Sequence, residues 1–309
     1  IFVALALAAP AVAQPAQHKP PSVLPSPPAD TINNAISRHN ASDVAYGAYE
    51  RGFYLTAFNE ATKFAQQNDP AAMTLLGELY ANGLGVGRDD TKAAQWYKLA
   101  ASHGDRDAMF ALAMFSFEGR AGPRDEDEAA RLLAAAGKLG HPAANYDLGL
   151  LYLQGQQFPK DFKHAAQLFR QAADAGNPEA QYALATMYKE GRGVPKDIRE
   201  YASLLRQASI AGNLDAMVEY GIAQFNGEGT DRNEPAAARL LLAAARRGSP
   251  IAQDRMARIL MAGRGMPADP TQAIRWHIIA KAAGASDPEL DLYASRQPKD
   301  VRDAAEAAG

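Results

Sequence analysis

A strict 36-residue repeat constrains the fold of this chain more than any other feature. One glycine column comprises Gly83, Gly119, Gly155, Gly191, Gly227 and Gly263. A second column, with the same spacing, comprises Gly104, Gly140, Gly176, Gly212, Gly248 and Gly284. Two alanine columns keep the same register, one running from Ala72 to Ala252 and the other from Ala100 to Ala280. A repeat of this length predicts a solenoid in which each unit packs against its neighbours.

The fourth unit shows how one repeat encodes two helices. Asn177 and Pro178 are typical of a helix start, and Gly191 is typical of a left-handed C-cap. Asp197 is the predicted N-cap of a second helix, which ends at Gly212. The predicted apolar face of that helix is Tyr201, Ala202, Leu204, Leu205 and Ala208. The alanine columns fall where two helices must approach closely, because a larger side chain would force the backbones apart. The chain is therefore predicted to be an all-α, right-handed superhelical solenoid of helix-turn-helix repeats.

The two ends of the repeat array are atypical. The segment from Gly47 to Asn68 matches the second half of a repeat, with Gly47 aligned to Gly83. We interpret 30–46 as a degenerate first helix, so that 30–68 is a partial repeat and cap. Six full repeats span 69–284. Residues 285–309 are predicted to be capping helices, one starting at 286–290 and one at 298–308, because terminal repeats must cover apolar surface with a polar face.

The N-terminal residues carry the features of a targeting segment. Residues 1–9 form an apolar run too short to span a bilayer, and the small residues Ala11 and Ala13 suit a signal peptidase. We interpret 1–13 as a signal peptide remnant, which predicts a periplasmic or secreted protein; a buried N-terminal helix is the alternative. Residues 14–29 contain six prolines and are interpreted as an extended linker, with a proline-motif ligand as the alternative.

Composition excludes several functional classes. A net charge of −3 argues against a nucleic-acid partner, which usually requires a basic excess. The absence of cysteine removes disulfides, thiolate metal sites and cysteine nucleophiles. Outside the first residues no apolar run approaches the length of a membrane-spanning helix, so no membrane span is predicted.

Residues that could carry chemistry form no recognisable active site. None of the six histidines pairs at the helical spacing of a metalloprotease, and His103 and His141 are expected to be solvent-facing turn residues. The Gly-x-Gly loops end helices, whereas phosphate-binding loops open them. No serine hydrolase motif is present. We therefore predict no catalytic residues, no metal site and no cofactor, and a protein that is not an enzyme.

The first helix of each repeat contains two variable columns, three residues apart, that helix packing does not require. Because residues three apart share a helix face, the apolar members of these columns are predicted to line the concave side of the solenoid. The predicted protein-binding groove consists of Met114, Phe117, Leu150, Leu153, Ile222 and Phe225. An exposed apolar stripe of this size is typical of a surface that binds a protein segment. The alternative is that these side chains fill a narrow superhelix.

The repeats resemble the Sel-one-like repeat family, a relative of the tetratricopeptide repeat. In the first unit the resemblance rests on Ala72, Leu76-Gly77, Tyr80, Gly83-x-Gly85-Val86, Asp89, Ala93-Ala94, Trp96 and Ala100-Ala101-x-x-Gly104. The chain departs from the family pattern at Ser116, Gln224 and Leu260, which replace a tyrosine, and at Gly122-Pro123 and Gln156, which disturb the Gly-x-Gly loop. These departures concern local loop shape.

The resemblance implies an adaptor or scaffold. Exported bacterial members of the family include negative regulators of membrane sensor kinases and components of polysaccharide export. We expect an exported binding protein whose groove engages a protein segment, such as part of an envelope signalling receptor. A structural component of an envelope or polysaccharide assembly complex is the first alternative. A hydrolase acting on the cell wall is a remote one, because the family members linked to such activity depend on cysteine pairs.

Overall fold

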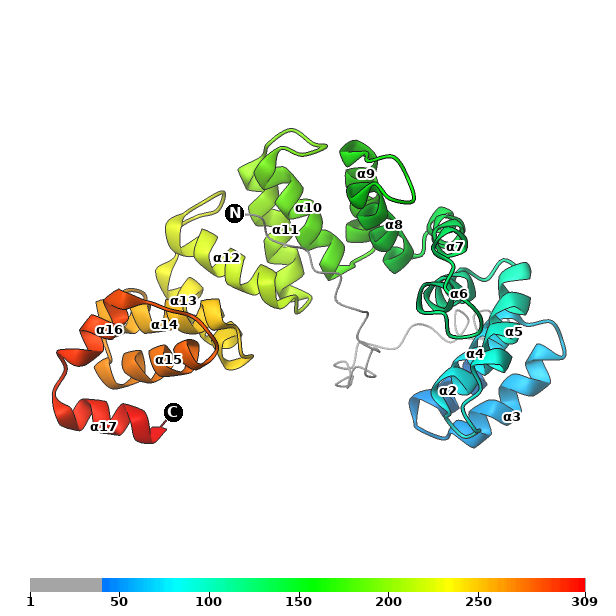
Figure 1. The fold of residues 1–309 in the computed structure, drawn as a ribbon, viewed down its shortest axis with the longest axis horizontal. Coiled ribbons are helices and arrows are strands. Elements are labelled where there is room, and N and C mark those ends of the chain that lie inside the picture. Colours follow the sequence, from blue (N-terminus) through cyan, green and yellow to red (C-terminus); the bar gives the residue numbers. More distant parts are fainter. Residues whose placement is uncertain (1–40, 309) are drawn as a thin grey trace, which may run out of the picture.

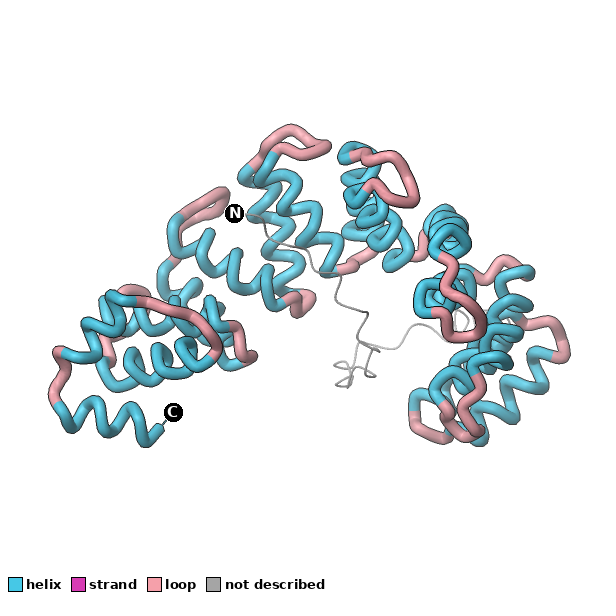
Figure 2. Tube along the Cα trace, in the orientation of Figure 1, coloured by secondary structure: helices cyan, strands magenta, loops and turns pink. Residues whose placement is uncertain are grey.

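The structure, a computed structural model, describes residues 41–308, which contain sixteen α-helices and no β-strand (Figure 2). The helices are α2 (Ala41–Glu50), α3 (Tyr54–Ala65), α4 (Pro70–Asn82), α5 (Asp90–Ser102), α6 (Arg106–Glu118), α7 (Glu126–Lys138), α8 (Pro142–Gln154), α9 (Phe162–Asp174), α10 (Pro178–Glu190), α11 (Ile198–Ile210), α12 (Leu214–Asn226), α13 (Glu234–Arg246), α14 (Pro250–Ala262), α15 (Pro270–Ala282), α16 (Pro288–Ser295) and α17 (Lys299–Ala308). The predicted all-α solenoid is confirmed.

Consecutive helices pack as pairs, and the pairs stack into an arch (Figure 1). Helices α4, α6 and α8 lie on the inner side of the arch, and α7 and α9 lie on its outer side. We call the surface formed by the first helix of each repeat, α4, α6, α8, α10, α12 and α14, the A face. The second helices are α5, α7, α9, α11, α13 and α15.

Capping residues set the helix ends, as the repeat columns predict. Asn177 accepts a hydrogen bond from the Ala180 N–H at 2.7 Å, and Asp197 caps α11 through the Arg199 and Glu200 N–H groups. Both glycine columns adopt a positive φ, between 66° and 94°, which glycine reaches without steric cost. The two alanine columns have no exposed surface at any of their twelve positions. The local chemistry of each repeat therefore encodes its helices.

The N-terminal unit departs from the predicted alignment. Gly47 lies inside α2 and does not adopt the left-handed conformation of Gly83; the left-handed glycine there is Gly52, with φ 78°. The connection between α2 and α3 spans only 51–53, whereas the connection between α4 and α5 spans 83–89. The shortened loop moves the first helix relative to the 36-residue register. Asn68 does take the left-handed conformation of Gly104, with φ 63°.

The ends of the array are closed by unlike elements. At the C-terminal end α16 follows the N-cap Asp287, and α17 packs against α15.

The signal peptide and linker interpretations for residues 1–29, and the part of the degenerate helix before residue 41, lie outside the described residues. None of the helices within residues 41–308 combines the length and apolarity needed to cross a bilayer.

Candidate protein-binding face

The six predicted groove residues lie on three first helices and are all half-buried. Met114 and Phe117 belong to α6, Leu150 and Leu153 to α8, and Ile222 and Phe225 to α12. Each pair packs its inner side against the buried core of its own region. They are therefore neither a fully exposed stripe nor a filled core: one side contributes to packing and the other faces solvent.

A hollow of about 310 Å³ brings two of these residues together with the next repeat. Ile222 and Phe225 of α12 form one wall, and Arg255, Arg258 and Met261 of α14 form the other. Leu241 of α13 contributes to the lining. The hollow shows that equivalent columns of neighbouring first helices meet on one surface, the A face. The structure thus brings Ile222 and Phe225 into one hollow. Met114 and Phe117 of α6 and Leu150 and Leu153 of α8 occupy equivalent positions on their helices but do not line this hollow.

Arginine side chains border this hollow, and two of them are held by carboxylates. The guanidinium of Arg264 lies 4.6 Å from the centre of the Phe225 ring and donates to Glu234 at 2.6 Å. Arg258 pairs with Asp287 at 2.5 Å and with Glu289 at 2.7 Å. The hollow is thus lined by apolar and polar side chains together, a combination that protein-binding surfaces use.

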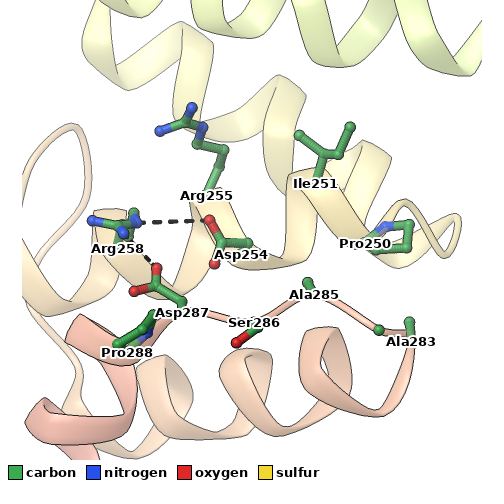
Figure 3. A pocket seen from close by; sticks show the side chains of 11 residues that line it. Pro250, Ile251, Asp254, Arg255, Arg258, Ala283, Ala285, Ser286, Asp287 and Pro288 are labelled. Carbon is green, nitrogen blue, oxygen red and sulfur yellow. Dashed lines mark ion pairs between the residues drawn. The ribbon is translucent and has the colours of Figure 1, made fainter. Parts of the chain in front are cut away.

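Arg258 also belongs to a second, open hollow of about 460 Å³ between α14 and the segment that leads into α16 (Figure 3). Figure 3 shows Arg258 between Asp254 and Asp287, while Arg255 points away from this group. Burial, together with the neighbouring Asp287, raises the pKa of Asp254 above its ordinary value. Because Arg258 joins α14 to the start of α16, this cluster is explained by its role in fixing the C-terminal cap.

The A face also contains a polar network that the sequence analysis did not identify. Glu219 of α12 accepts hydrogen bonds from the hydroxyls of Tyr182 and Tyr201, both at 2.8 Å, and pairs with Lys189 at 3.5 Å. Tyr182 and Lys189 lie on α10, so the network links neighbouring first helices across the A face. The available signal was the charge in this column: Asp147, Glu219 and Arg255 are equivalent to Leu75, Ala111 and Ala183.

One histidine has a role that the sequence analysis assigned wrongly. His103 is exposed, as expected, but His141 is half-buried and caps α8 by accepting the Ala144 N–H at 3.1 Å through Nδ1. Its ring stacks on Phe110, with centroids 4.4 Å apart. Burial lowers the pKa of His141, which favours the neutral ring that this cap requires. The residue therefore has a structural function in the turn between repeats.

Among residues 41–308, no group of histidine and acidic side chains is arranged to hold a metal ion.

The family model for the Sel1 repeat matches six consecutive segments: 70–105, 106–141, 142–177, 178–213, 214–249 and 250–284. The chain belongs to the Sel1 repeat family. A Sel1 repeat protein from Oxalobacter formigenes has a solved structure with 25% identity and a TM-score of 0.66; the match covers 80% of this chain and 99% of that one. The family resemblance in the repeats is thus confirmed along most of the chain.

A second solved structure shares the fold. It is c5321 from uropathogenic Escherichia coli, a protective antigen displaying an SLR fold, with 24% identity and a TM-score of 0.54. The match covers 82% of this chain and 63% of c5321. No curated protein matches the chain. Sel1 repeats form a class of solenoid that generally mediates protein interactions, and the role and partner of this chain are matters for proposal.

Proposed function

We propose that this chain is a non-enzymatic scaffold of the bacterial cell envelope whose A face binds a protein segment. The observation that carries the proposal is the hollow between α12 and α14, where Ile222 and Phe225 present half-buried apolar surface beside polar side chains. Apolar surface that the fold leaves incompletely covered favours a partner, because its burial releases water. The Sel1 family membership supports a binding role over a catalytic one.

The proposed location is the periplasm or the cell exterior, and the proposed partner is a segment of an envelope signalling receptor. Both extend the sequence analysis: the location rests on residues 1–13, and the partner rests on the family resemblance. A structural role in an envelope or polysaccharide assembly complex remains the alternative, since the same surface would serve it.

Crosslinking in living cells, followed by purification and mass spectrometry, tests the proposal. The wild-type chain is compared with Phe225→Ala, which enlarges the hollow, and with Leu139→Ala, which shortens an exposed side chain after α7. We expect a partner that is recovered with wild type and with Leu139→Ala and lost with Phe225→Ala, while circular dichroism shows all three proteins folded.

The identity of the recovered protein separates the two roles. A receptor or sensor ectodomain supports the regulatory scaffold, and a set of export or assembly proteins supports the structural role. Recovery that does not depend on Phe225 contradicts the binding surface proposed here.

A further inference from the structure

Charge is distributed unequally between the two helices of the repeat. The five first helices α4, α6, α8, α10 and α12 contain eight acidic and two basic residues. The five second helices that pair with them, α5, α7, α9, α11 and α13, contain seven acidic and ten basic residues. The first helices of the first five repeats therefore carry an excess of carboxylates beside their half-buried apolar side chains, whereas α14 carries two arginines and one aspartate.

One of these carboxylates lies within the predicted groove. Asp147 of α8 is three residues before Leu150, so the two side chains share a helix face. Asp147 is half-buried, and within the described chain it forms neither a hydrogen bond nor an ion pair. Burial raises its pKa from 3.8 to about 7. Partial burial of a carboxylate without a partner disfavours its charged form, and a cation brought beside it would offset that cost.

The equivalent position two repeats later shows which partners this carboxylate lacks. Glu219 occupies the same column as Asp147 and is satisfied by Lys189, Tyr182 and Tyr201. The residues that hold those three places relative to Asp147 are Phe117, Phe110 and Ala129. The fold therefore supplies Glu219 with a cation and two hydroxyl donors, whereas the three equivalent positions relative to Asp147 hold apolar residues. Phe117, which stands where Lys189 would, is itself one of the predicted groove residues.

We propose that the part of the A face formed by α6 and α8 binds a cationic amphipathic protein segment, with a Lys or Arg side chain of that segment paired to Asp147. Apolar side chains of the same segment pack against Phe117 and Leu150. The inference rests on the proposed function and specifies the chemistry of its partner: the excess of carboxylates selects a basic segment, and the apolar surface selects one with hydrophobic residues at helical spacing. An acidic surface of this kind repels nucleic acid.

Three synthetic peptides of matched length test this inference against the full chain. The first repeats Leu-Lys-Lys-Leu, the second repeats Leu-Gln-Gln-Leu and the third repeats Ser-Lys-Lys-Ser. Dissociation constants are measured by isothermal titration at pH 8 and low salt. We expect the first peptide to bind more tightly than the other two, because it alone offers both cations and apolar side chains.

Asp147→Asn and Asp174→Asn give the matched comparison. Asp174 is an exposed acid on α9, a second helix. We expect Asp147→Asn to weaken binding of the Leu-Lys-Lys-Leu peptide by about tenfold, the usual effect of losing a charge-assisted hydrogen bond, and Asp174→Asn to leave it unchanged. Circular dichroism of both variants verifies that they remain folded.

The outcomes separate the inference from the proposed function. Equal affinity for the Leu-Lys-Lys-Leu and Leu-Gln-Gln-Leu peptides, or equal affinity of the wild type and Asp147→Asn, overturns the cationic partner and leaves the binding face standing. A chain that binds none of the three peptides contradicts both.

Discussion

At the residue scale, the acidic groups of the A face differ in what surrounds them. Tyr182 and Tyr201 have raised pKa values, through burial first and then through the neighbouring Glu219. Those hydroxyls therefore stay protonated and continue to donate to Glu219. Asp147 has no such donors, and burial alone raises its pKa to about 7. The same column thus contains one carboxylate that stabilises the stack and one that destabilises it when ionised.

This difference predicts a pH dependence of stability that Asp147 controls. Its pKa is higher in the folded chain than in the unfolded chain, so the protonated group favours folding most below about pH 4, and this contribution is lost as the pH rises to about 7. A shift of three pH units corresponds to about 4 kcal/mol as an upper bound. We expect Asp147→Asn to unfold at higher urea concentration than wild type at pH 8.

Asp174→Asn is the control for this measurement. It removes an exposed carboxylate from α9, so the change in stability between pH 4 and pH 8 should remain that of wild type. An Asp147→Asn variant with the wild-type slope would show that Asp147 does not titrate in this range.

At the element scale, the two helices of a repeat fit through paired side chains. A methyl group added to Gly149 of α8 would lie 2.5 Å from the Phe169 ring of α9, and one added to Gly77 would lie 2.5 Å from Tyr97. In the second and fourth repeats the corresponding pairs are Ala113 with Leu133 and Ala185 with Leu205. In the first and third repeats a glycine thus faces an aromatic ring, and in the second and fourth an alanine faces a leucine. The last two repeats use other pairs, Gly221 with Leu241 and Ala257 with His277.

Gly149→Ala should therefore destabilise the protein although alanine is the better helix former. We expect the overpacking to lower the free energy of unfolding by about 1–3 kcal/mol, measured by chemical denaturation. The double variant Gly149→Ala with Phe169→Leu recreates the pair found in the second and fourth repeats, and should regain most of the loss relative to the sum of the single variants. Purely additive effects would contradict this pairing.

A helix end can be predicted from the sequence when the residues that determine it lie within a few positions of it. Asn177, Asp197 and Gly191 act on the backbone within a few residues, so the sequence predicts their helix ends. Gly47 was misassigned because a single glycine does not reveal that the loop before α3 is shorter. The capping role of His141 depends on backbone geometry and ring stacking that the sequence pattern does not show.

At the scale of the whole molecule, the substantial helix contacts within residues 41–308 lie inside a repeat or between neighbouring repeats, so nearest-neighbour stacking holds the arch together. The A face consequently forms only when the first helices of neighbouring repeats stack side by side. Glu219 meets residues 18 to 37 positions away, and this is why neither its network nor the isolation of Asp147 was predicted from local patterns. The equivalence of Phe117 and Phe225 follows from the repeat register alone, whereas their role in a groove stays a prediction.

Nearest-neighbour stacking predicts that one entire repeat is dispensable for folding. Deleting 178–213 joins Asn177 to Leu214 in register, so circular dichroism should show a helical protein with a single cooperative thermal transition. Deleting 178–195 removes α10 alone and leaves α11 without its partner helix. We expect that variant to lose cooperativity; equal stability of the two deletions would contradict the stacking account.

The central claim is that the A face binds the partner, and a photo-crosslinking scan tests it most directly. Benzoylphenylalanine is placed at Phe117, Leu153 and Phe225 of the A face, or at Leu99, Leu139 and Ile210, which lie on or directly after second helices and are 42%, 49% and 76% exposed. Chance encounters favour the second set because it is more exposed. We predict crosslinks to one partner from the A-face positions alone. Crosslinks that are stronger at the more exposed positions Leu99, Leu139 and Ile210 would contradict the account.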